Sequence, residues 1–212
     1  MTWADSPAFQ RRGYHHGNLR EALIDAALTL IAERGPAGFS ITEAARRAGV
    51  SPAAPYRHFR DADALLVEIG VRGFDRFTET LSRAWNDGRP DPTTAFHAMG
   101  GAYLGFAANE PAYYAAMFET PPSNHPELAA ARDRAFQVLR DAAAQLCARI
   151  PKPERPPALM VALHVWSLSH GIASLFCRPD RGHRAIPMSP EELLEAGVLV
   201  YLKGLGLIAT PS

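Results

Sequence analysis

Cysteine is scarce in this 212-residue chain, which contains only Cys147 and Cys177. Two cysteines do not make the disulfide framework of a small secreted protein. The chain also lacks an apolar run of transmembrane length and a charged-then-apolar leader. These absences argue against a disulfide scaffold and a membrane partner, and they favour the reducing cytoplasm. Because 47% of the residues are hydrophobic, the chain can bury a sizeable core.

The motifs of common enzymes are missing as well. The sequence has no HExxH, no GxSxG, no Walker loop and no cysteine and histidine spacing that suits a metal. GLGLIA, which ends at Ala209, imitates a dinucleotide-binding fingerprint, but only three residues remain for the helix that should follow. We therefore expect no catalytic residue, no cofactor and no metal site. A cofactor-free enzyme remains an alternative.

The formal net charge is zero, but the charge is unevenly distributed. Residues 1–60 hold eight arginines and five acids, a net charge of +3, and the remainder of the chain carries −3. A basic segment on a neutral protein fits a local contact with a polyanion, and it is also typical of a solvated surface. Arg11 and Arg12 would belong to a flexible basic arm.

The N-terminal segment predicts a helix-turn-helix. A first amphipathic helix runs from Asn18 to a stop at Gly35 and Pro36. Ser40 and Glu43 match a capping box, so a second helix runs to about Ala48. Gly49 suits a tight turn, and Ser51 would cap a third helix. Two helices joined by three or four residues that include glycine form this motif.

Two prolines make the predicted third helix unusual. Pro52 would occupy the first helical position, where the missing N–H costs nothing. Pro55 would forfeit only the first backbone bond, to Ser51, and would stiffen the first turn. Phe59 is expected to pack on the first helix, and packing is the alternative for Tyr56 as well.

The exposed end of this element suits DNA. Ala53 and Ala54 present small methyl faces that allow close approach to a thymine methyl in the major groove. Tyr56, His58 and Arg60 can donate to phosphates.

The run from HHGNLREALIDAAL through GFSITEAARRAGVSPAAPYRHFRDADALL resembles the DNA-binding domain of the TetR family of bacterial transcriptional regulators. The resemblance covers about Tyr14 to Leu66. It implies a homodimer that binds a palindromic double-stranded DNA operator, with a three-helix DNA-binding domain over residues 1–63. It also implies a larger helical domain over residues 64–212 that binds a small-molecule effector and dimerises. The expected function is a ligand-released repressor.

The family's roles transfer to matching positions of this sequence. Ser40 and Thr42 would meet phosphates, Ala53 and Ala54 would face bases, and Tyr56 and His58 would clamp the backbone; Ser51 belongs to the same surface. The sequence departs from the family at two positions. Members often have a bulky apolar residue in place of Pro55 and a lysine in place of Ala62, so Arg60 is the candidate substitute for a missing phosphate contact.

The rest of the chain predicts an all-α fold. Proline, glycine and asparagine bound six further helices, with no strand-like alternation of useful length. These helices are expected over 64–86, 92–109, 112–119, 127–149, 158–177 and 190–207.

The last two of these helices carry the expected dimer interface. Trp166, His170 and Gly171 resemble the Trp and His-Gly signature of one TetR-family C-terminal domain. Small residues at helical spacing let another helix approach closely, and the last helix supplies an apolar stripe. Ordinary intramolecular packing is the alternative. The expected interface residues are Ser167, Gly171, Ser174, Leu194, Val198, Tyr201 and Leu205.

Aromatic residues gather in the middle of the chain and predict an effector pocket. A concave apolar cavity edged by hydroxyls suits a small apolar or amphipathic ligand, and ordinary core packing is the alternative. The candidate ligand-binding residues are Phe96, Met99, Tyr103, Phe106, Tyr113, Met117, Phe118, Trp166 and His170. A third possible class, a helical adaptor that binds only protein, would keep the dimer stripes but would not need the YRHF end.

Overall fold

The computed structural model describes residues 19–119, 125–177 and 187–208, and this part of the chain is helical without any strand. The eight α-helices are α1 Leu19–Arg34, α2 Ile41–Arg47, α3 Ala62–Trp85, α4 Pro92–Asn109, α5 Pro111–Glu119, α6 Pro126–Cys147, α7 Ala158–Phe176 and α8 Pro190–Gly204. Short 3-10 turns lie at η1 Pro36–Gly38, η2 Pro55–Arg57, η3 Asn86–Gly88 and η4 Lys152–Glu154. The all-α prediction is confirmed.

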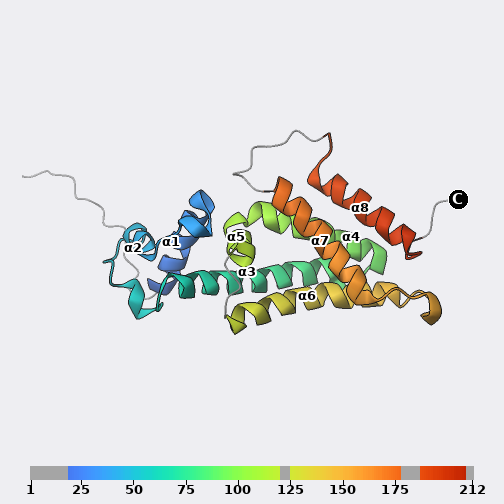
Figure 1. Cartoon of the computed structure of the whole chain (residues 1–212), viewed down its shortest axis with the longest axis horizontal. Coiled ribbons are helices and arrows are strands. Elements are labelled where there is room, and N and C mark those ends of the chain that lie inside the picture. Colours follow the sequence, from blue (N-terminus) through green and yellow to red (C-terminus); the bar gives the residue numbers. More distant parts are fainter. Residues whose placement is uncertain (1–18, 120–124, 178–186, 209–212) are drawn as a thin grey trace, which may run out of the picture.

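The molecule is elongated, with α1 and α2 at one end (Figure 1). We call residues 19–61 the head and residues 62–208 the body. Helix α3 runs from the head along the length of the body, beside α6, while α7 and α8 cross above it (Figure 1). The predicted domain boundary, between residues 63 and 64, falls inside α3, which passes through it unbroken.

Helix α3 begins where a side chain satisfies its first turn. Asp61 caps it by accepting a hydrogen bond from the Ala64 backbone N–H at 2.8 Å. Its apolar stripe then enters the core, where Phe74 and Phe77 are fully buried. The long helix therefore joins head and body through both its backbone and its packing.

The predicted capping box at α2 is wrong. Ser40 makes no side-chain cap; its Oγ instead lies 2.8 Å from Thr42 Oγ1. Glu43 accepts two hydrogen bonds from Arg34 Nη1, at 2.9 and 3.1 Å, so its carboxylate does not reach back to the start of α2. The complete capping box in the described chain lies at the start of α8, between Ser189 and Glu192.

Helix α7 corrects the sequence-based statement about apolar runs. By length and composition, Ala158–Phe176 is apolar enough to cross a membrane, and one such helix is weak evidence because core helices pass the same test. One third of its most apolar stretch is buried. The helix packs against α4, α6 and α8 as part of the core. It also has an exposed face.

Candidate DNA-binding surface and ligand site

A tight turn connects α2 to the predicted reading element. Gly49 has a φ of +72°, a conformation that glycine adopts without a steric penalty. Its N–H donates to Arg46 O at 3.1 Å, and the Val50 N–H donates to Ala45 O at 3.0 Å. These bonds satisfy the last carbonyls of α2 and redirect the chain.

The predicted third α-helix is a 3-10 turn instead. Pro52 and Ala53 form a turn, Ala54 lies in a bend, and η2 spans only Pro55–Arg57, so Ser51 does not cap an α-helix. Pro55 is fully buried at the first position of η2. The backbone N–H groups of His58 and Phe59 both donate to Pro55 O at 2.9 Å. The second proline is therefore the buried anchor of the element.

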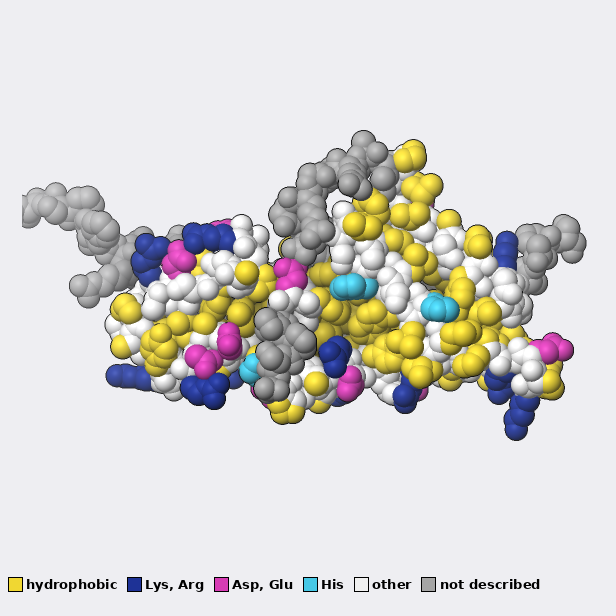
Figure 2. Space-filling view, viewed as in Figure 1, with side chains coloured by type: hydrophobic (Ala, Val, Ile, Leu, Met, Phe, Trp, Pro, Cys, Tyr) yellow, Lys and Arg dark blue, Asp and Glu magenta, His cyan; other side chains and the backbone are white. Residues whose placement is uncertain are grey.

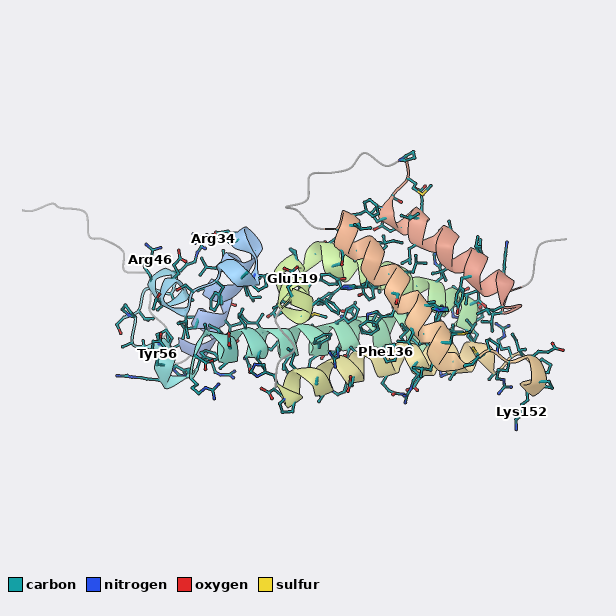
Figure 3. All side chains as sticks on the ribbon, in the orientation of Figure 1. Arg34, Arg46, Tyr56, Glu119, Phe136 and Lys152 are labelled. Carbon is teal, nitrogen blue, oxygen red and sulfur yellow. The ribbon has the colours of Figure 1, made fainter. Side chains whose placement is uncertain are left out.

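The residues around this anchor alternate between core and solvent. Phe59 is buried, as predicted, with the Arg20 guanidinium 5.3 Å from its ring centre. Tyr56 is 52% exposed and stands at the end of the head that is remote from the body (Figure 3). The exposed residues of the surface are Ser51, Ala53, Tyr56, Arg57, His58 and Arg60, with Ala54 half-buried beside them.

The cations of this surface differ in their pairing. Arg60 donates from Nε to Asp61 Oδ2 at 2.8 Å, so the α3 cap partly neutralises it. Arg57, which the sequence analysis did not single out, is exposed and has no ion-pair partner among the described residues. Its position inside the YRHF run, between Tyr56 and His58, could have identified it as a candidate for a phosphate contact. Arg11 and Arg12 lie outside the described residues.

Four polar side chains meet inside the predicted ligand site. The Tyr114 hydroxyl lies 2.8 Å from His170 Nδ1, and the Tyr103 hydroxyl lies 3.2 Å from the same nitrogen. Ser174 Oγ lies 3.4 Å from His170 Nε2. An unprotonated Nδ1 can accept from Tyr114, the nearer hydroxyl, while the Tyr103 hydroxyl lies 3.3 Å from the Tyr114 hydroxyl and can donate to it, and an N–H on Nε2 faces Ser174. Burial lowers the pKa of His170, which favours this neutral imidazole.

Aromatic rings pack closely around this polar cluster. Phe118 lies 4.6 Å from His170 and 4.8 Å from Tyr114 between ring centres. Tyr103 makes an edge contact with Phe77 at 4.9 Å and with Trp166 at 6.3 Å. These contacts are those of a packed core, so the effector pocket at this position stays a prediction.

Some predicted ligand residues lie away from His170. Phe96 lines a small groove of about 70 Å³ between α4, α7 and α8, and Tyr113 packs against the Arg76 guanidinium at 4.9 Å. Met117 fills the space beside Gly73. Phe106 packs on Phe77 at 5.1 Å, and Met99 is buried on α4.

A separate cavity adjoins the cluster at the junction of head and body. It has a volume of about 330 Å³ and lies between the end of α1 and helices α4, α5 and α7. Tyr114 belongs to both its wall and the His170 cluster. Ala107 also lines it, whereas Gly105 faces a different groove beside Arg76 and Arg83.

The predicted dimer residues on α7 and α8 differ in how far they are exposed to solvent. Leu194 is buried against Gly100 of α4, so this residue packs within the chain. Val198, Tyr201 and Leu205 are half-buried, and the Tyr201 hydroxyl lies 2.8 Å from His164 Nδ1. Ser174 is also half-buried, beside His170.

An exposed stripe runs along α7 with a spacing of four residues. It comprises Leu159, Leu163, Ser167, Gly171 and Leu175, of which Gly171 is half-buried with open space where a Cβ would stand. Beside it, α8 exposes Ala196, Leu199 and Val200, the last 72% exposed. We call these eight residues the outer apolar face, and Figure 2 shows hydrophobic side chains gathered over both helices.

Comparison with known families accounts for both ends of the molecule. Residues 23–69 match the family described as "Bacterial regulatory proteins, tetR family", and residues 96–201 match "Tetracyclin repressor-like, C-terminal domain". The chain belongs to the TetR family. It is a DNA-binding transcriptional regulator and not an enzyme.

Several relatives resemble this TetR chain. YobS of Bacillus subtilis (strain 168), an uncharacterized HTH-type transcriptional regulator, is 26% identical over 100 residues, which are 47% of this chain and 51% of YobS. The chain therefore matches about half the length of that curated relative. A protein with unknown function from Rhodococcus sp. RHA1 is 30% identical with a TM-score of 0.76, over 91% of this chain and 98% of that chain.

A third relative has the same fold at lower identity. AibR, solved in complex with isovaleryl coenzyme A and operator DNA, is 21% identical with a TM-score of 0.66. The similarity covers 85% of this chain and 96% of AibR.

Proposed function

We propose that this TetR-family chain is a repressor that binds a palindromic operator as a homodimer and is released by a small apolar or amphipathic effector. The observation that carries the proposal is the exposed surface of residues 51–60 on its buried Pro55 anchor. A rigid turn with small side chains at its centre and polar tips at its edge suits a major groove.

The residues of this surface have different roles in the proposal. Ala53 and Ala54 approach base edges, while Tyr56, His58 and Arg57 contact phosphates. Ser40, Thr42 and Ser51 add polar contacts to the backbone, and Arg60, shared with Asp61, contributes a weaker one. Arg11 and Arg12 would extend the contact as a basic arm. Residues 1–63 would form the DNA-binding domain and residues 64–212 the effector and dimer domain.

The proposed dimer forms through the outer apolar face. Exposed leucines and Val200 beside Ser167 and Gly171 give two helices a surface that packs closely on its own copy. Two copies of α7 and α8 would make a four-helix interface and would set the spacing of the two heads. Trp166, His170 and Gly171 as the signature of one C-terminal domain type belong to the same proposal.

The effector is proposed to act near Tyr103, Tyr114 and His170. These residues supply hydrogen-bonding groups inside an apolar shell, which is the composition of a typical small-molecule site. The complex of AibR with isovaleryl coenzyme A and operator DNA supports regulation of this kind.

Selection from a random pool of double-stranded DNA tests the proposal. The full-length protein should enrich an inverted repeat, and its affinity should fall as salt rises because phosphate contacts release counterions. The adaptor alternative predicts no enriched sequence and no steep salt dependence, and such a result would overturn the proposed function.

A further inference from the structure

We infer that Arg20 is a positioning residue for DNA recognition, because Arg20 and Glu68 together hold the 51–60 segment against α3. The inference deepens the proposed function and rests on it, since it concerns the segment that is proposed to contact DNA. Arg20 lies in the first turn of α1, and Glu68 lies in the second turn of α3. Neither residue belongs to the segment that they hold.

The 51–60 segment has two anchors in the core. Within it, only Pro55 and Phe59 are buried, and the residues around them are exposed or half-buried. The Phe59 N–H donates to Pro55 O at 2.9 Å, which links the two anchors. The exposed side chains between them are those proposed to contact phosphates. Their orientation therefore depends on how firmly the Phe59 ring is fixed.

Arg20 fixes this ring from the side of α1. The guanidinium carbon of Arg20 lies 5.3 Å from the centre of the Phe59 ring, a distance at which a cation is attracted to an aromatic ring. The Arg20 side chain is 40% exposed, so packing alone does not hold it. Its Nη1 donates to Glu68 Oε1 at 2.8 Å, which ties the guanidinium to α3.

Glu68 is itself held in place. The same oxygen, Oε1, accepts a second hydrogen bond from Arg72 Nε at 2.8 Å, one turn further along α3. Burial alone would raise the pKa of Glu68, but the hydrogen bonds from Arg20 and Arg72 lower it below the ordinary value, so the side chain is a carboxylate at neutral pH. Charge-assisted hydrogen bonds are the stronger and more directional ones. A continuous series of contacts thus runs from Glu68 through Arg20 to Phe59.

The negative charge of Glu68 distinguishes positioning from a direct contact with DNA. A carboxylate has no proton to donate to a phosphate, and near DNA it repels the backbone. If Glu68 acted only through its charge, neutralising it would strengthen binding to every duplex. If Glu68 positions Arg20, neutralising it weakens binding to the operator, because base contacts require an accurately placed segment, while sequence-independent binding does not fall.

Glu68→Gln in the full-length protein tests the inference by fluorescence anisotropy. The probes are a duplex that the wild type enriches and a scrambled duplex of equal length. Affinity for the enriched duplex should fall about tenfold, comparable to the loss of one base contact, and affinity for the scrambled duplex should not fall. Equal discrimination by the wild type and the variant, or stronger binding of both duplexes, would overturn the inference.

Asp75→Asn is the matched control. It neutralises a carboxylate of the same helix that pairs with Arg134 of α6, in the body, at 2.6 Å. This variant should discriminate between the two duplexes like the wild type. A loss equal to that of Glu68→Gln would show that any lost carboxylate of α3 has this effect, and would contradict the inference.

Arg20→Met removes the other member of the pair. Because each substitution breaks the same link, the double variant with Glu68→Gln should discriminate no worse than Arg20→Met alone. Additive losses would show that the two residues act separately.

Amide hydrogen exchange of the DNA-free protein gives a readout that needs no operator. The N–H groups of His58 and Phe59 both donate to Pro55 O, and they should exchange faster in Glu68→Gln than in the wild type or Asp75→Asn. The amides of α6 serve as the internal reference and should not change. Unchanged exchange at His58 and Phe59 would overturn the inference. Failure of the proposed function is distinguishable, because the wild type would then enrich no duplex, whereas failure of this inference leaves that enrichment intact.

Discussion

Arg72 on α3 holds Glu21 on α1 through two parallel hydrogen bonds. Arg72 Nη1 donates to Glu21 Oε2 at 2.6 Å, and Nη2 donates to Oε1 at 2.7 Å. Arg72 Nε also donates to Glu68 at 2.8 Å, and Glu68 accepts from Arg20 at 2.8 Å. This partly buried network joins the head to α3.

Arg72→Met should therefore destabilise the protein by about 1–2 kcal/mol, between the values for exposed and buried ion pairs. Glu21 would lose both hydrogen bonds from Arg72, and Glu68 would lose one of its two arginine partners, while both carboxylates are partly buried. Arg134→Met is the matched control, since Arg134 pairs with Asp75 at 2.6 Å with both side chains about half exposed. Its effect in urea unfolding should stay below about 0.5 kcal/mol. Equal effects of the two substitutions would show that the network contributes no more than a surface pair.

Ala53→Glu should abolish operator binding without changing the melting temperature. Ala53 is exposed on the proposed reading surface, where a carboxylate would face bases and phosphates. Ala130→Glu places the same side chain at an exposed position of α6, away from the head, and should leave the operator affinity unchanged. Specific binding by the Ala53 variant, measured by fluorescence anisotropy, would place the reading surface elsewhere.

Arg57→Gln should affect the salt dependence of DNA binding more than Arg60→Gln. Each phosphate contact contributes about 1 to the slope of log affinity against log salt, so Arg57→Gln should lower the slope by about 1 for each half-site. Arg60 already shares its charge with Asp61, so its loss should matter less. A larger change from Arg60 would contradict the pairing argument.

Tyr56→Phe should weaken binding to all DNA sites about equally, by about 1 kcal/mol, because the variant loses its hydroxyl contact with a phosphate.

Val200→Glu should dissociate the proposed dimer into folded monomers. Val200 is the most exposed large apolar residue of the outer apolar face, and an unpaired charge buried there costs several kcal/mol. Tyr56→Glu is the control, because it adds the same charge to an exposed residue of the head. Light scattering that still reports a dimer for the Val200 variant would place the interface on another surface.

Local signals predicted helix bounds well where caps are encoded in sequence. Helix α4 occupies the predicted range Pro92–Asn109, because Asp91 caps it and Pro92 fits its first position. The capping box at Ser40 failed because Arg34 competes for Glu43 across a tertiary contact. A local motif cannot reveal such a competitor.

The turn that contains Pro55 and the outer apolar face show the same limit. Pro52 and Pro55 were compatible with a short α-helix, but in the structure Pro55 is buried at the first position of a 3-10 turn. In α7, apolar residues occupy both the buried positions Val161 and Ile172 and the exposed position Leu163. Periodicity identifies these stripes, but only the packing of α4, α6 and α8 decides which one faces solvent.

The His170 cluster should make stability depend on pH below about 6.5, the ordinary pKa of histidine. Burial lowers the pKa of His170 below its ordinary value of 6.5, so the unfolded chain binds a proton at a higher pH than the folded chain. Its contribution is fully present above pH 6.5 and is lost as pH falls from there to the lower folded pKa. Protonation of Nδ1 would also remove the acceptor that Tyr114 uses at 2.8 Å.

His170→Gln should remove this dependence. Between pH 7 and pH 5.5 the melting temperature of the wild type should fall more than that of the variant, because the folded wild type resists protonation of His170. The exposed His164 is the control: His164→Gln should leave the wild-type pH dependence intact, which separates the buried imidazole from histidines in general. Differential scanning calorimetry at matched ionic strength measures the difference, and parallel curves for wild type and His170→Gln would show that His170 titrates equally in the folded and unfolded chain.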